Sequence, residues 1–139
     1  MISYNTISFF IVFLCCTLLG CSPNNSTATA EALYEKTIFT DNPSQPKIKE
    51  GDQVSIYYCL KNGTKIITSS AHALEPTIIT IPNDDALDKF QRPLTWLGLG
   101  DSCIVHINVE DAAEELESYK EHFKSGEKAT FIYKVLKID

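Results

Sequence analysis

The chain of 139 residues lacks the motifs of the commoner hydrolases and nucleotide-binding enzymes. It contains no Gly-x-Ser-x-Gly nucleophile elbow, no glycine-rich phosphate loop and no Cys-x-x-Cys pair. Its histidines, His72, His106 and His122, are scattered without the spacing of metal ligands. The sequence therefore predicts neither covalent catalysis nor a metal or an organic cofactor.

Basic residues are also scarce. The chain has 12 Lys and Arg against 18 Asp and Glu, which gives a formal net charge of −6, and all of these charges lie beyond residue 30. This balance argues against nucleic-acid binding and against electrostatic docking on an anionic membrane, because both need a basic surface. We interpret the carboxylates that gather in residues 110–121 as the solvated face of a helix.

The first twenty residues contain no charged side chain, and residues 9–16 form the apolar run FFIVFLCC. That run is short for a membrane span but suits the apolar region of a secretory signal. The residues LLGC at 18–21 resemble the lipobox of bacterial lipoproteins. This resemblance implies cleavage after Gly20 and acyl chains on the sulfur and the amine of Cys21. Because the segment before the apolar run has no Lys or Arg, an uncleaved N-terminal anchor stays open as the alternative.

Both interpretations place the rest of the chain outside the cytoplasm and beside a membrane. Residues 22–30, SPNNSTATA, are small and polar and predict a flexible tether. We expect a signal peptide over 1–20, the lipidated Cys21 and the tether over 21–33, and one domain over 34–139. Each buried methylene of the acyl chains contributes ~0.8 kcal/mol, so anchoring would be effectively permanent. The expected location is the bacterial cell envelope, and the outer membrane is favoured over the inner one.

Cys59 and Cys103 remain once the signal and Cys21 are set aside. Both lie in predicted strands among apolar neighbours. An exported pair could form a disulfide, and otherwise the two residues would be small buried hydrophobic side chains. The sequence leaves both outcomes open.

Alternating and β-branched stretches predict most of the domain as strands. The predicted strands cover residues 36–40, 53–61, 64–68, 77–81, 102–109 and 128–138. Asn62-Gly63, between the second and the third, is a two-residue hairpin signal.

Two helices are expected beside these strands. The first begins at Asn83 or Asp84 and has Leu87, Phe90 and Leu94 on one face. The second covers residues 110–123, and its thin apolar stripe consists of Ala113, Leu116, either Tyr119 or Lys120, and Phe123. The predicted fold class is α+β, an antiparallel sheet packed on a short helix.

Several motifs follow one another in the predicted domain. GDQVSIYY at 51–58 is a Gly-Asp turn and an alternating strand, IITS at 66–69 follows the hairpin signal, and EPTII at 75–79 is an apolar strand after a proline. LGLGD at 97–101 is a glycine-acid turn, and ATFIYKVLKI at 129–138 alternates to the end. In this order the motifs resemble the FKBP-type peptidyl-prolyl cis-trans isomerases. The resemblance implies an FKBP-like antiparallel sheet wrapped on a short helix.

The resemblance also implies a pocket for a proline ring. Phe90 would form its floor in place of the Trp of the family, and Tyr58 and Tyr133 would form walls, so these three are the expected catalytic residues. The acid of the family falls on Ile67, or on Thr68 if the turn is one residue longer. The sequence therefore lacks the carboxylate of the family, and fewer polar groups would stabilise the twisted peptide carbonyl. The expected substrate contacts are Ile66, Ile67, Ile79, Leu87 and Tyr119.

Such a pocket needs no nucleophile. An X-Pro amide isomerises over a barrier of ~18–20 kcal/mol, and a site that favours the twisted amide over the planar one lowers it. The resemblance implies a monomeric isomerase that assists the folding of exported polypeptides rich in X-Pro bonds. Two alternatives stay open. One is a non-catalytic module that holds a proline peptide within an envelope assembly, such as one for gliding, and the other is a structural lipoprotein whose own side chains fill the pocket.

Overall fold

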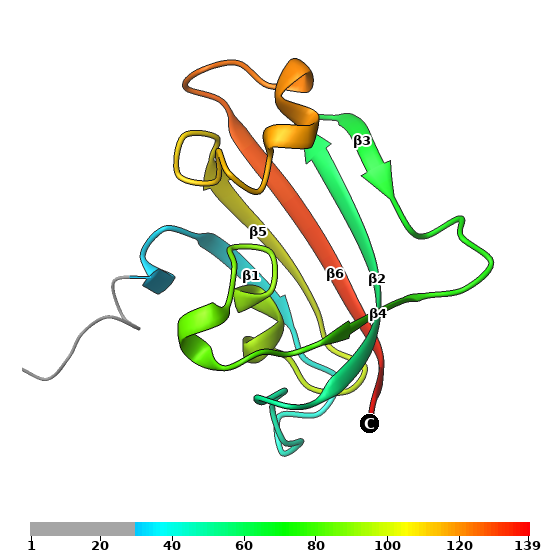
Figure 1. Cartoon of the computed structure of the whole chain (residues 1–139). Coiled ribbons are helices and arrows are strands. Elements are labelled where there is room, and N and C mark those ends of the chain that lie inside the picture. Colours follow the sequence, from blue (N-terminus) through cyan, green and yellow to red (C-terminus); the bar gives the residue numbers. More distant parts are fainter. Residues whose placement is uncertain (1–29) are drawn as a thin grey trace, which may run out of the picture.

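The computed structural model describes residues 30–139 (Figure 1). The predicted signal peptide, Cys21 and nearly all of the predicted tether lie outside the described residues. Within residues 30–139, no helix combines the length and the apolar character that a membrane crossing requires.

Six strands form one antiparallel sheet (Figure 1). They are β1 (Glu35–Phe39), β2 (Gln53–Asn62), β3 (Lys65–Ser69), β4 (Thr77–Thr80), β5 (Ser102–Asn108) and β6 (Lys128–Ile138). Every strand end lies within one residue of the prediction. All of the strand pairs are antiparallel, so the predicted antiparallel sheet is confirmed. The order across the sheet is β1-β5-β6-β2-β3, and β4 pairs with the first half of β2.

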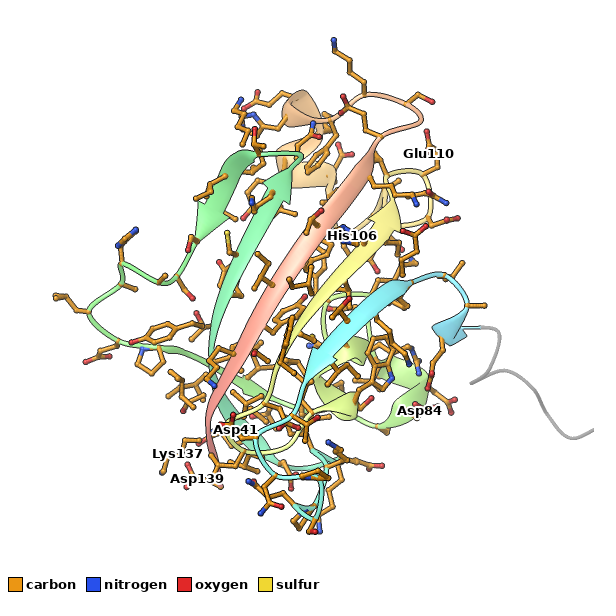
Figure 2. All side chains as sticks on the ribbon, turned by 180° about the vertical axis from the view of Figure 1, so that it is seen from behind. Asp41, Asp84, His106, Glu110, Lys137 and Asp139 are labelled. Carbon is orange, nitrogen blue, oxygen red and sulfur yellow. The ribbon has the colours of Figure 1, made fainter. Side chains whose placement is uncertain are left out.

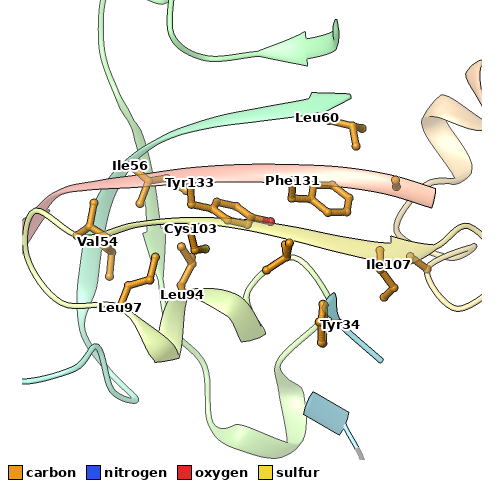
Figure 3. Packing of buried hydrophobic residues seen from close by; sticks show 14 of the residues in the cluster. Tyr34, Val54, Ile56, Leu60, Leu94, Leu97, Cys103, Ile107, Phe131 and Tyr133 are labelled. Carbon is orange, nitrogen blue, oxygen red and sulfur yellow. The ribbon is translucent and has the colours of Figure 1, made fainter. Parts of the chain in front are cut away.

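The core lies on one face of this sheet (Figure 3). Because side chains alternate along a strand, every second residue of the central strands points to this face. The loops between β4 and β5 cover it with Leu94 and Leu97, which are fully buried. On the opposite face, seen in Figure 2, the ring Nδ1 of His106 lies 2.8 Å from the hydroxyl oxygen of Thr130 on the neighbouring strand.

The two predicted α-helices do not form. Residues 30–139 contain three short 3-10 helices instead, η1 (Asp84–Ala86), η2 (Arg92–Trp96) and η3 (Glu117–His122). The described domain is therefore dominated by its sheet, and the helical part of the α+β prediction is wrong.

Asp88 accounts for the interruption between η1 and η2. Its Oδ1 accepts hydrogen bonds from the backbone amides of Phe90 at 2.8 Å and Gln91 at 2.7 Å. A side chain that binds nearby amides in this way offers the backbone an alternative to helical hydrogen bonds. Pro93 also lacks the amide proton that a continuing helix would use. A helix from Asn83 to Leu94 is therefore not formed.

Like charges at helical spacing disfavour the second predicted helix. Glu114, Glu117 and Glu121 are spaced three and four residues apart, and such like-charged neighbours destabilise an α-helix. The backbone here instead makes bonds across three residues, such as the amide of Tyr119 donating to the carbonyl of Leu116 at 2.8 Å. The segment therefore tightens into turns and η3.

The apolar side of this segment differs from the predicted stripe, because the segment forms turns and η3 and not an α-helix. Ala112 is fully buried, whereas the predicted Ala113 is exposed. Leu116 and Phe123 are buried as expected, and of the two alternatives at the third position Tyr119 is half-buried while Lys120 is exposed.

The hairpin between β2 and β3 turns one residue later than the sequence signal indicates. Asn62 pairs with Lys65, so the two loop residues are Gly63 and Thr64. Gly63 has φ +55°, and no residue other than glycine has a positive φ in the described part. A type I′ turn at Asn62-Gly63 would need a positive φ at both central residues, whereas a turn with glycine first needs it only there. Because β2 is one residue longer than predicted, β3 also begins and ends one residue later than predicted.

Cys59 and Cys103 are both free thiols. Cys59 pairs with Ile132 and Cys103 pairs with Tyr133, and these partners are consecutive residues of β6. Since consecutive side chains point to opposite faces of a sheet, the two thiols lie on opposite faces. The disulfide that the sequence left open is therefore absent.

Candidate functional site

A pocket with a volume of about 280 Å³ lies on the core face of the sheet, and its lining is almost entirely apolar. The lining comes from β2, β3, β4 and β6, from the loop between η1 and η2, and from η3. Its residues are Ile56, Tyr58, Leu60, Thr68, Thr77, Ile79, Phe90, Tyr119, Phe131 and Tyr133.

Facing residues of β2 and β6 form the part of the pocket lining that comes from the centre of the sheet. Tyr58 lies opposite Tyr133, and Leu60 lies opposite Phe131. Directly opposite side chains on one face of an antiparallel pair lie in contact range. The rings of Phe131 and Tyr133 are nearly parallel, at 17°, with centroids 6.3 Å apart. This register brings three aromatic rings and one leucine together in the lining.

Phe90 covers one side of the pocket from the loop between η1 and η2. Its ring packs against Phe131 with centroids 4.6 Å apart and planes tilted by 54°. Its backbone amide is held by Asp88 at 2.8 Å, so the turn that prevents the helix also fixes this side chain. The loop is held in place further by Lys89, whose backbone amide and side-chain Nζ both bind Glu115.

Tyr119 covers another side from η3. The segment that carries it is tied to the sheet by Asn62, whose Nδ2 donates to the backbone oxygen of His122 at 2.8 Å and to Oε2 of Glu127 at 2.7 Å. The end of β2 thus positions a wall of the pocket that is far away in the sequence.

A bulge in β3 decides which of its residues reaches the pocket. Leu60 pairs with Thr68, but the next residue, Lys61, pairs with Ile66, so Ile67 is an extra residue without a partner on β2. Because Thr68 is paired with a core-facing leucine, it faces the pocket. Ile66 is paired with Lys61 on the other face, where its side chain is 59% exposed. Of the two positions that the sequence left open for the family's acid, Thr68 is the one in the lining.

Five of the eight predicted site residues meet in the pocket, namely Tyr58, Ile79, Phe90, Tyr119 and Tyr133. Ile66 points away, and Ile67 packs half-buried against the core without lining the pocket. Leu87 lines a different hollow, together with Tyr34 and Arg92. Leu87 was placed on the face of an α-helix that does not form, so its predicted direction did not apply.

The lining also contains residues that the sequence analysis did not assign to the site. Phe131, Ile56 and Leu60 lie on the same strand faces as Tyr58 and Tyr133, so the alternation that predicted the strands could have identified them. Thr77 precedes Ile79 by two residues on β4 and shares its face for the same reason.

The electrostatics of the pocket are those of an apolar site. None of its ten lining residues is charged. Burial raises the pKa of Tyr133 well above the usual 10.0, and neighbouring Cys103 and Asp88 raise it further. The phenol is therefore neutral throughout the physiological range. Among the described residues no three His, Cys, Asp or Glu side chains are placed so that they could hold a metal ion.

No model of a known protein family and no curated protein matches the chain.

Proposed function

We propose that the protein is an FKBP-like peptidyl-prolyl cis-trans isomerase whose pocket receives the proline ring of a polypeptide. The observation that carries this proposal is the apolar pocket itself, lined by Tyr58, Phe90, Tyr119 and Tyr133 at positions taken from the family resemblance. An antiparallel sheet that presents aromatic residues from its central strands supports the same assignment.

Prolyl isomerisation needs no covalent step on a side chain. Rotation about an X-Pro bond needs loss of amide resonance, with no bond made or broken to the protein. Aromatic walls such as Phe90 and Phe131 bury the proline ring and remove water from the amide. Binding energy from the ring then serves to hold the amide away from planarity, which lowers the barrier.

The proposed location follows from the sequence. Acyl chains on Cys21 would hold the domain at a membrane of the bacterial envelope, where newly exported polypeptides fold. Uncatalysed X-Pro isomerisation takes tens of seconds or longer, which makes it a slow step for such clients. The clients of this proposal are exported polypeptides with X-Pro bonds.

The second candidate is a module that binds a proline segment without isomerising it, within an envelope assembly. One observation favours it. Of the two positions that correspond to the family's acid, only Thr68 lines the pocket, and the lining contains no carboxylate. Tight binding of the ground state without strain would then retain a partner segment instead of turning it over.

The test is exchange spectroscopy by NMR on a short peptide with one X-Pro bond, using the full chain in detergent. We expect cis-trans exchange above the uncatalysed rate, and Phe90→Ala should reduce it at least tenfold, as expected for loss of a large apolar contact. Phe39→Ala is the matched control, because this phenylalanine lies on β1 outside the pocket and is 53% exposed. Binding of the peptide without faster exchange would favour the module, and absence of binding would refute both candidates.

A further inference from the structure

Tyr133 has a buried side chain whose hydroxyl lacks a partner among the described residues. Its side chain is 3% exposed and lines the pocket, and its hydroxyl makes no hydrogen bond to another described residue. Tyr34 is also buried, but its hydroxyl donates to the backbone oxygen of Lys89 at 3.1 Å. Buried tyrosine hydroxyls usually have such a partner, because leaving one unpaired costs free energy.

The oxygen of Tyr133 is nevertheless not sealed inside the protein. Among the described residues, every side-chain oxygen or nitrogen that is completely enclosed has a hydrogen-bond partner. The unpaired Tyr133 oxygen must therefore border open space, and the space that its side chain lines is the pocket. Figure 3 shows the ring lying along β6 with the hydroxyl oxygen toward Phe131, another lining residue.

The surroundings of this hydroxyl keep it a hydrogen-bond donor. The titratable groups around it are Cys103, Asp88, Tyr34 and Tyr58, and each of them disfavours the phenolate, after burial as the main cause. A neutral phenol can donate its proton to an acceptor in the pocket. Because no lining residue is charged, a charged ligand group would lose its hydration without compensation there. The acceptor that fits is a neutral carbonyl oxygen.

We propose that the Tyr133 hydroxyl donates a hydrogen bond to a carbonyl oxygen next to the bound proline ring and thereby makes this carbonyl a requirement of recognition. The inference rests on the proposed proline-binding function and narrows its ligand class to neutral prolyl amides. Tyr58 and Tyr119 also line the pocket, but both are only half-buried and their hydroxyls can keep water as a partner. Tyr133 is thus the polar contact that replaces the missing carboxylate.

The test compares the full-length protein with Tyr133→Phe, which removes one oxygen and keeps the ring. A proline peptide with a ¹³C-labelled carbonyl on either side of the ring serves as the probe. We expect Tyr133→Phe to weaken peptide binding about tenfold, as for loss of one neutral hydrogen bond. The infrared carbonyl band of one labelled position should shift to lower frequency on binding to the wild type but not to the variant.

Two further measurements separate this role from a structural one. The midpoint of urea unfolding should be unchanged or higher in Tyr133→Phe without ligand, because the variant loses only an unpaired hydroxyl. Tyr57→Phe is the matched control and should bind like the wild type, because Tyr57 lies next to Tyr58 on β2, points to the opposite face of the sheet and does not line the pocket. Equal binding and equal carbonyl bands for wild type and Tyr133→Phe would overturn this inference and leave the proposed function standing. A wild type that binds no proline peptide would overturn both.

Discussion

The ammonium nitrogen of Lys47 lies 3.0 Å from Oδ2 of Asp101, a carboxylate that is completely buried. The same carboxylate accepts the backbone amides of Gly98 at 2.8 Å and Asp41 at 3.0 Å. Burial alone would raise the pKa of Asp101, but these hydrogen bonds outweigh it and hold the pKa below its usual value of 3.8. Asp101 thus joins the loop after β1 to the turn before β5, at the end of the sheet where Figure 2 places Asp41.

We predict that Asp101→Ala lowers the free energy of unfolding by ~3 kcal/mol, because it leaves two backbone amides without their acceptor. Lys47→Met should cost less than ~1 kcal/mol, since the lysine side chain is 42% exposed and its ion pair is partly solvated. Urea unfolding of both variants measures the difference. Equal losses would show that the lysine, and not the two amides, is the main contact of the carboxylate.

The Cys103 thiol makes stability depend on alkaline pH. Burial raises its pKa from 9.0 to about 12. Between these values the unfolded chain loses the thiol proton while the folded chain keeps it, so the free energy of unfolding falls as pH rises, by up to ~1.4 kcal/mol per pH unit. Below pH 9 the thiol is protonated in both states and contributes no slope. We expect Cys103→Ala to reduce the fall between pH 9 and 11, as measured by urea unfolding at several pH values. The same slope in both proteins would contradict this origin.

Ile78 and Ile79 are consecutive residues of β4 that point to opposite faces of the sheet. Ile79 lines the pocket, whereas Ile78 is 61% exposed. Ile79→Ala should weaken proline-peptide binding by about fivefold or more, because burying its side chain against a ligand contributes ~1 kcal/mol or more. Ile78→Ala is the matched control and should bind like the wild type. Titration calorimetry measures both, and equal effects would show that β4 does not contact the ligand.

Asn62 is predicted to hold the wall that carries Tyr119. Asn62→Ala removes the hydrogen bonds to His122 and Glu127, so the segment of η3 should open more readily. We expect faster amide hydrogen exchange at Tyr119 and Phe123, whose amides bond within this segment, and unchanged exchange in β5. Asn62→Asp serves as a comparison, because it retains the shape but cannot donate. Exchange that rises equally throughout the sheet would indicate global destabilisation instead.

Much of the fold followed from local pattern. The alternation of Val54, Ile56 and Leu60 and of the matching residues in β6 predicted both strands, because one buried face selects every second residue. The same pattern correctly placed Tyr58 and Tyr133 on one side of the sheet. These features depend on neighbouring residues in a single strand, and the sequence states them directly.

The helices were predicted from apolar spacing and were wrong, because spacing does not report competing hydrogen bonds. Asp88 binds two backbone amides just after it, and this competes with the helix that would have directed Leu87 toward the pocket. Near Tyr119, the like charges of Glu114, Glu117 and Glu121 disfavour the second predicted helix, and apolar spacing does not report this effect either.

The sequence by itself determined the six strands, and the family resemblance pointed to the aromatic residues of the candidate site. Only the tertiary structure decided that Thr68 lines the pocket while Ile66 points away from it. The two residues would share a face in a regular strand, and the single bulge at Ile67 puts them on opposite faces. Only the pairing of β2 with β6 showed that Tyr133 lies opposite Tyr58 in the lining of the pocket. Strand alternation is a local property, whereas register and the satisfaction of buried polar groups depend on segments that meet only after folding.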